Sequence, residues 1–157
     1  MSGGAARPAP VKVALIAAAL AAGLVPAPAR ADPVDATRLL AAIPGEIMFV
    51  RIAGTWASPE REGLTRIVLI RPSVRAEAMR LFVQWLAPDS RGSRFAVVAA
   101  EEVPEVFDWR LKIDDYRIEP ETTGSRVLFE ATVLTNGQRR RYELTIGPPG
   151  DVMFAAR

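Results

Sequence analysis

The chain of 157 residues contains neither cysteine nor histidine. Without cysteine there are no disulfides, so a folded domain depends on its hydrophobic core alone. The absence of both residue types excludes serine-histidine-aspartate and cysteine-histidine nucleophile pairs, and the usual transition-metal sites. An enzyme built from this sequence would have to use carboxylates, tyrosine, serine, arginine or Lys112. We therefore expect a non-catalytic protein without a cofactor or metal.

The first 31 residues have the features of a secretory signal peptide. Arg7 and Lys12 give a positive segment, residues 13–25 are an uninterrupted apolar run, and Ala29-Arg30-Ala31 is a small-x-small cleavage site before Asp32. The apolar run is too short for an ordinary membrane span. We expect a periplasmic or secreted protein, not an integral membrane protein, whose mature chain begins at Asp32.

Removal of the leader changes the charge balance. It takes away three of the 20 basic residues and none of the 18 acidic ones, which leaves 17 against 18 and a net charge of −1 in place of +2. Proteins that bind nucleic acid normally present a basic surface, so we expect no nucleic-acid partner. Residues 32–157 have a suitable length for a single domain. The excess of arginine over lysine, 18 to 2, is typical of a GC-rich bacterial sequence.

The clearest structural pattern is a predicted β-hairpin over residues 125–147. Asn136-Gly137 stands between two β-rich runs and favours a two-residue type I′ turn. That turn pairs Val133 with Arg140 and Ala131 with Tyr142, and it gathers nearly all apolar side chains on one face. Arg140 is the exception on this face. We expect its aliphatic stem to pack while its guanidinium reaches water at the rim, with a ligand-binding arginine as the alternative.

Apolar and polar residues alternate along most of the remaining chain. A short helix is expected over residues 36–42, capped by Asp35 and ended by Pro44-Gly45. The other expected strands cover residues 46–56, 64–71, 94–103, 107–118 and 151–157. The first strand has one apolar face, formed by Met48, Val50, Ile52, Gly54 and Trp56. In the strand over residues 107–118 the apolar positions change from odd to even at Asp114-Asp115, which predicts a β-bulge.

Residues 73–86 fit either a helix or a strand. As a helix, Ser73 would be the N-cap and one stripe would contain Val74, Ala78, Leu81, Phe82 and Trp85. As a strand starting near Met79, the odd-numbered residues would share one face. We favour the strand because the second half of the segment is β-rich. An α+β fold with a helix over residues 74–86 is the alternative.

About eight short strands joined by short turns indicate an antiparallel barrel or sandwich. Gly54-Thr55-Trp56, after a short helix and at the end of the first strand, resembles the G-x-W signature that opens lipocalins and other calycins. Arg157 ends the last strand, where lipocalins often place an arginine across that tryptophan in a cation–π contact. The resemblance implies a small up-and-down β-barrel of the lipocalin type.

Five aromatic residues either line a cavity in this barrel or fill a solid core: Trp56, Trp85, Trp109, Phe129 and Tyr142. Our leading hypothesis is an exported protein that holds a small apolar or amphipathic molecule in the barrel. Its wall or base would be formed by Trp56, Trp85, Phe129 and Tyr142, with Arg140 at the rim. The alternative is a solid-core periplasmic protein-interaction or envelope accessory module.

Neighbouring charged residues offer little for catalysis. Glu101-Glu102 and Asp114-Asp115 lie on predicted strands, where adjacent side chains point to opposite faces, so neither pair converges on one atom. Alternation also divides Arg139-Arg140-Arg141 between the faces, and Glu130 and Glu143 balance the outer charges. An enzymatic function would require a carboxylate or Tyr116 facing a cavity.

Overall fold

The computed structural model describes residues 33–73, 78–92 and 94–157. Within these ranges the elements are α1 (Pro33–Ala41), β1 (Ile47–Ala57), β2 (Glu62–Ile70), β3 (Arg80–Pro88), β4 (Phe95–Val103), α2 (Pro104–Asp108), β5 (Leu111–Glu121), β6 (Gly124–Val133), β7 (Gln138–Ile146) and β8 (Val152–Ala156). The predicted signal peptide lies outside the described residues. The predicted short helix is present, but it begins at Pro33, a favoured first helical residue, so Asp35 lies inside its first turn.

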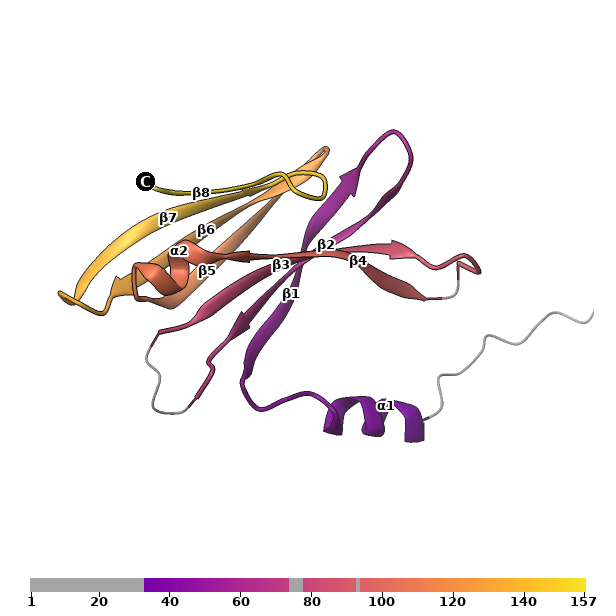
Figure 1. The fold of residues 1–157 in the computed structure, drawn as a ribbon, viewed down its shortest axis with the longest axis horizontal. Helices are drawn as coiled ribbons and strands as arrows, with labels where there is room; N and C mark the ends of the chain where they lie inside the picture. The colour runs from indigo at the N-terminus through magenta and orange to yellow at the C-terminus, as the bar shows by residue number, and fades with distance from the viewer. Residues whose placement is uncertain (1–32, 74–77, 93) are drawn as a thin grey trace, which may run out of the picture.

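The eight strands form two separate antiparallel sheets, β1-β2-β3-β4 and β5-β6-β7-β8 (Figure 1). Each sheet is a meander of consecutive strands, which confirms the prediction of a mainly antiparallel β protein. The prediction of a closed barrel is wrong. Among the described residues β4 pairs with β3 and β5 pairs with β6, and no ladder joins the two sheets.

The sheets separate at Pro104. Proline has no N–H to continue a β ladder, and its fixed φ suits the first turn of a helix. Helix α2 begins at this residue, with Glu105 in its first turn, and carries the chain from β4 to β5. A helical turn therefore stands where a hairpin between β4 and β5 would have continued the sheet.

Helix α2 also overturns the predicted start of a strand at residue 107. Phe107 lies in the helix and Trp109 ends it, and both side chains are exposed. Strand β5 begins only at Leu111. Its register against β6 slips between Ile113 and Asp115, so the predicted β-bulge is confirmed.

Strand β3 settles the ambiguity over residues 73–86 wherever the chain is described. Leu81, Val83 and Trp85 are buried and alternate with half-buried Phe82 and Gln84. The strand is confirmed and the helix is wrong from residue 80 onward, because β3 pairs on both sides, with β2 and with β4. Residues 74–77, where a helical turn was the alternative, lie outside the described residues.

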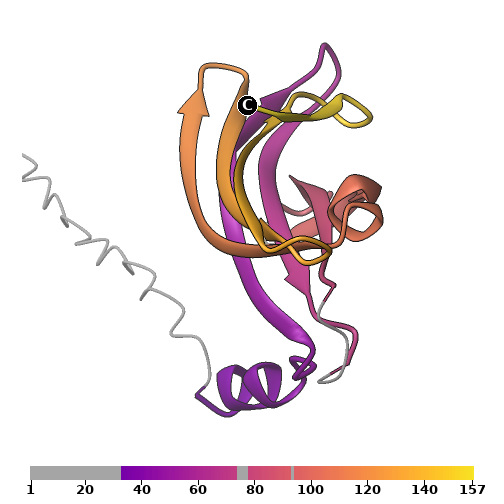
Figure 2. The ribbon, with the colours of Figure 1, turned by 90° about the vertical axis from the view of Figure 1, so that its left-hand side faces the viewer.

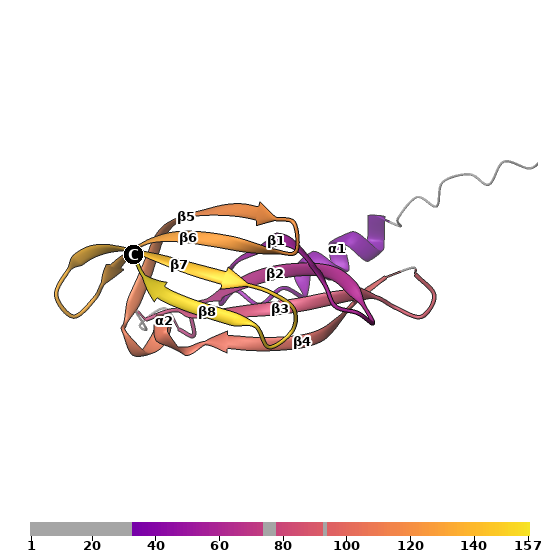
Figure 3. The ribbon, with the colours of Figure 1, turned by 90° about the horizontal axis from the view of Figure 1, so that it is seen from above.

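The hydrophobic core lies between the sheets, where the second sheet overlies part of the first (Figures 2 and 3). Strand β1 lies against β5 and β6, and α2 lies against β3 and β5. Both sheets supply large, fully buried side chains, namely Ile67, Leu81, Val83 and Trp85 from the first and Leu111, Val127, Phe129, Leu144 and Ile146 from the second.

The β6–β7 hairpin has the predicted faces but another register. It pairs Ala131 with Arg140 and Phe129 with Tyr142, two residues away from the predicted ladder. The type I′ turn does not form, because Gly137 has positive φ (70°) and Asn136 does not. Instead residues 134–137 form the loop, and the Gly137 N–H donates to the Val133 carbonyl at 2.8 Å. A shift of two residues leaves every side chain on its original face, so the predicted buried face is confirmed.

Gly54 lies where the first sheet touches the second. A Cβ atom at this position would stand 2.8 Å from the Gly124 carbonyl oxygen and 3.1 Å from the Ser125 Cβ. The close approach of β1 to β6 therefore requires a residue without a side chain.

We predict that Gly54→Ala lowers the free energy of unfolding by about 1–3 kcal/mol through overpacking. Gly45→Ala is the matched control, because no atom lies within 4 Å of its added Cβ, and it should change stability by less than about 0.5 kcal/mol. Urea denaturation followed by circular dichroism measures both. Equal stability of the two variants would contradict the contact.

Candidate functional site

The four aromatic residues predicted to bind a ligand lie in the core. Trp56, Trp85, Phe129 and Tyr142 are each at most 3% exposed. The indole N–H of Trp56 donates to the Leu86 carbonyl at 3.2 Å, and that of Trp85 donates to the Gly147 carbonyl at 2.8 Å. These polar groups are therefore already used within the fold.

Aromatic rings fill one end of the space between the sheets. Phe154 stacks on Tyr142 with ring centres 5.4 Å apart, and it also contacts Trp109 at 5.8 Å and Phe129 at 6.3 Å. Such spacings are typical of packed aromatic clusters. Phe129 and Tyr142 are therefore part of the core, the second of the two roles considered from the sequence, whereas Trp109 packs on the cluster with its side chain exposed.

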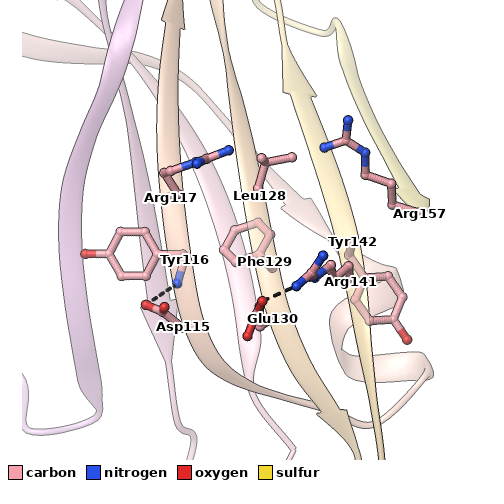
Figure 4. Close-up of a pocket in the computed structure, with 9 residues that line it drawn as sticks. All are labelled: Asp115, Tyr116, Arg117, Leu128, Phe129, Glu130, Arg141, Tyr142 and Arg157. Atoms are coloured by element: carbon pink, nitrogen blue, oxygen red, sulfur yellow. Dashed lines mark hydrogen bonds and ion pairs between the residues drawn. The ribbon is translucent and has the colours of Figure 1, made fainter.

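Phe129 and Tyr142 also border a depression on the outer face of the second sheet (Figure 4). It has a volume of about 340 Å³ and is open to solvent. Its charged lining residues are Asp115, Arg117, Glu130, Arg141 and Arg157. Arg140 lies in two neighbouring depressions, one of which it shares with Tyr142.

The arginines around this depression are balanced by acidic neighbours. Arg141 pairs with Glu130 at 3.2 Å, as Figure 4 shows, and Arg157 Nε lies 3.6 Å from Glu143. The prediction that Glu130 balances the arginine cluster is therefore confirmed at Arg141, whereas Glu143 pairs with Arg126 and Arg157, and Arg139 lies 4.0 Å from Asp114. The expected contact of Arg157 with Trp56 does not form, because Arg157 lies on the solvent side of the second sheet.

The Tyr116 and Glu102 side chains, which were considered for catalysis, also form a hydrogen bond or an ion pair within the fold. The Tyr116 hydroxyl accepts a hydrogen bond from Arg51 Nε at 2.8 Å, and its ring stacks on Phe49. Glu102 pairs with Arg80, on the face opposite to Glu101. In the described part of the chain, no group of three or more acidic residues is placed to hold a metal ion.

A second depression, of about 400 Å³, lies at one end of the first sheet. It is lined largely by apolar residues, including Trp56, Leu64, Pro88 and Phe95. Trp56 is thus the one predicted site residue here, well away from the depression shared by Phe129 and Tyr142. The predicted site residues are not brought together around one cavity.

The first sheet has an apolar surface that the sequence did not predict. The face of the first sheet turned away from the core, which we call the apolar outer face, carries Met48, Val50, Ile52, Leu64, Val68, Ile70, Phe82, Leu86, Phe95 and Val97. Met48, Val50, Ile52, Phe95 and Val97 are 38–54% exposed. Large exposed apolar patches of this kind usually mark an interaction site.

A bulge in β1 explains why this surface was missed. The register against β2 slips between Ile52 and Gly54. The slip turns Met48, Val50 and Ile52 outward while Trp56 remains in the core, whereas the sequence pattern had placed all four on one face. Residues 47–50 are apolar at every position, so alternation could not identify the inner face.

Comparison of the chain with protein-family models, with curated proteins and with solved structures finds no match in any of the three. Among the described residues, no helix is both long enough and apolar enough to cross a membrane.

One titratable group has a pKa clearly set by its neighbours. The Thr132 hydroxyl donates to the Asp114 carboxylate at 2.6 Å, and Lys112 Nζ lies 3.4 Å away. The hydrogen bond from Thr132, followed by the charges of Lys112 and Arg139, holds the pKa of Asp114 below its ordinary value of 3.8, although partial burial opposes this. The bulge residue is therefore fixed to the neighbouring strand.

We predict that Thr132→Val raises the pKa of Asp114 toward 3.8. Because the folded pKa lies below the unfolded one, the stabilisation is complete above the unfolded value and is lost as pH falls through the folded value. The stability difference between the wild type and the variant should therefore shrink in acid. NMR titration of the carboxyl carbon measures the pKa, with Thr145→Val as a control on the same face. An unchanged Asp114 pKa in Thr132→Val would refute the assignment.

Proposed function

We propose that the chain is an exported, non-catalytic protein-interaction module that docks a partner on the apolar outer face. The observation that carries this proposal is the exposure of five large apolar side chains on one sheet face, which is open to solvent in the described structure. Export is inferred from the leader sequence. A core filled by aromatic side chains favours this function over ligand storage inside the fold.

Polar groups on this face define what a partner must provide. Arg66 Nε donates to Gln84 Oε1 at 2.7 Å across the middle of the sheet. Arg80 pairs with Glu102 at one end of it and lies over the Phe107 ring at 4.6 Å. A partner that covers the face must therefore be mostly apolar and must offer an acceptor to the remaining N–H groups of Arg66.

The β4 side of the apolar outer face offers a direct test. A photo-reactive residue in place of Phe95 should capture a saturable partner in cells of the native host, and Val97→Glu should reduce this capture at least tenfold by placing a charge in the interface. Met153→Glu is the matched control, because Met153 is 62% exposed on the outer face of the second sheet. Circular dichroism would confirm that each variant folds. Equal capture by both variants would exclude docking on this face.

A second candidate function is the binding of a small apolar or amphipathic ligand, for which the depression at Trp56 is the specific support. Its volume of about 400 Å³ suits a small molecule, and Leu64, Pro88 and Phe95 supply apolar walls. In this case Trp56 would serve as the base of an open surface site.

Native mass spectrometry of the protein purified from its own host tests ligand binding. A bound ligand would appear as a reproducible extra mass that is lost on denaturation. We predict that Leu64→Trp, which fills the depression, abolishes the extra mass, while Met153→Trp on the other sheet keeps it. A wild-type protein without any extra mass, also after incubation with a lipid extract of the host, would dismiss this candidate.

A further inference from the structure

No other described residue buries the apolar side chains of helix α1. Every described side chain from Ala36 to Glu46 is exposed, and Leu39, Leu40 and Ile43 are 53–70% exposed. Figures 1 and 2 show the helix beyond the end of β1, apart from both sheets. Isolated helices of fewer than about 12–15 residues are marginal in water. This helix of nine residues therefore needs a surface to pack on.

The apolar residues of this segment follow a helical stripe. Ala36, Leu39, Leu40 and Ile43 stand at positions i, i+3, i+4 and i+7, the pattern of a helix that buries one side. Its last turn continues beyond Ala41, because the Ile43 N–H donates to the Leu40 carbonyl at 3.2 Å. The stripe is therefore ordered as far as Ile43.

A surface of matching size lies on β1. Met48, Val50 and Ile52 are exposed side by side on the apolar outer face. Nine helical residues span about 13 Å, and the strand from Met48 to Ile52 also spans about 13 Å. One helix of this length covers these three side chains.

We propose that two copies of the chain form a twofold dimer by exchanging α1, so that the helix of each copy covers Met48, Val50 and Ile52 of the other. This inference rests on the proposed function, since it names the occupant of the β1 side of the apolar outer face. Exchange of a terminal element is a common route to symmetric dimers.

The connection between α1 and β1 favours a second copy over the chain's own face. The Ile47 N–H donates to the Pro44 carbonyl at 3.1 Å, and the Arg71 N–H donates to the Glu46 carbonyl at 2.8 Å. These bonds fix the direction in which α1 leaves the sheet. In this position α1 does not lie on β1 of its own chain (Figures 1 and 2), and folding back onto it would require the helix to leave this position.

The exposed apolar area sets an upper limit for the contact. Complete burial of the six large apolar residues in both symmetric helix-on-sheet contacts would cover roughly 1,200 Å², which reaches the lower limit of a standard interface. The β4 side, with Phe95 and Val97, stays open for a different partner.

The absence of cysteine from the chain permits a clean test by disulfide trapping. Leu40→Cys and Val50→Cys are made separately in the mature chain, mixed and oxidised. Exchange predicts a mixed disulfide dimer at least fivefold above that formed when Val50→Cys is replaced by Met153→Cys, which is exposed on the other sheet. Equal yields would overturn the proposal.

The double variant Leu40→Cys/Val50→Cys distinguishes exchange from folding back. Exchange predicts that oxidation gives a covalent dimer, also when the protein is diluted before it is oxidised. A monomer with an internal disulfide would overturn the proposal. Sedimentation should show a dimeric wild type and a monomeric, folded Leu40→Glu variant. A monomeric wild type, together with partner capture by the photo-reactive residue at position 95, would refute exchange and leave the proposed function standing. A dimeric wild type without such capture would support exchange and refute docking of a different partner on the β4 side.

Discussion

One buried hydrogen bond ties the two sheets together. The Trp85 indole N–H, on β3, donates to the Gly147 carbonyl in the turn between β7 and β8, at 2.8 Å. The sheets share no ladder in the described structure, so this bond and the packing around it take the place of the hydrogen bonds that close a barrel. A buried N–H left without an acceptor costs about 1–3 kcal/mol. The position of the β7–β8 turn is therefore coupled to the first sheet.

The other large aromatic residues also have structural roles. Trp56 donates to the Leu86 carbonyl within the first sheet, and Arg51 of that sheet donates to the Tyr116 hydroxyl of the second. The polar groups of these side chains therefore have partners within the fold, in addition to apolar packing. Side chains committed in this way are poor candidates for changing partners with a ligand. The surfaces of the sheets are therefore better placed than the interior to bind a partner.

Alternation in the sequence predicts faces better than it predicts register or topology. The buried face of the β6–β7 hairpin is correct although its register is shifted, because a period of two survives a shift of two residues. The predicted continuous meander is interrupted between β4 and β5 at Pro104, a residue whose effect on sheet pairing is not visible in hydrophobic periodicity. The apolar outer face was missed for a related reason, since alternation does not show the bulge between Ile52 and Gly54, although a glycine inside a strand is one sign of a bulge.

The outer faces of the two sheets differ in a way that folding alone does not require. On the second sheet, ion pairs such as Arg141–Glu130 and Arg126–Glu143 face the solvent. The first sheet has the same number of strands and the same meander order, yet its outer face is mostly apolar. Polar residues there would leave the core unchanged and improve solubility. The apolar outer face is retained at this cost to solubility, and it directly follows α1, whose apolar side chains are also exposed among the described residues. Both features favour a surface that binds a partner.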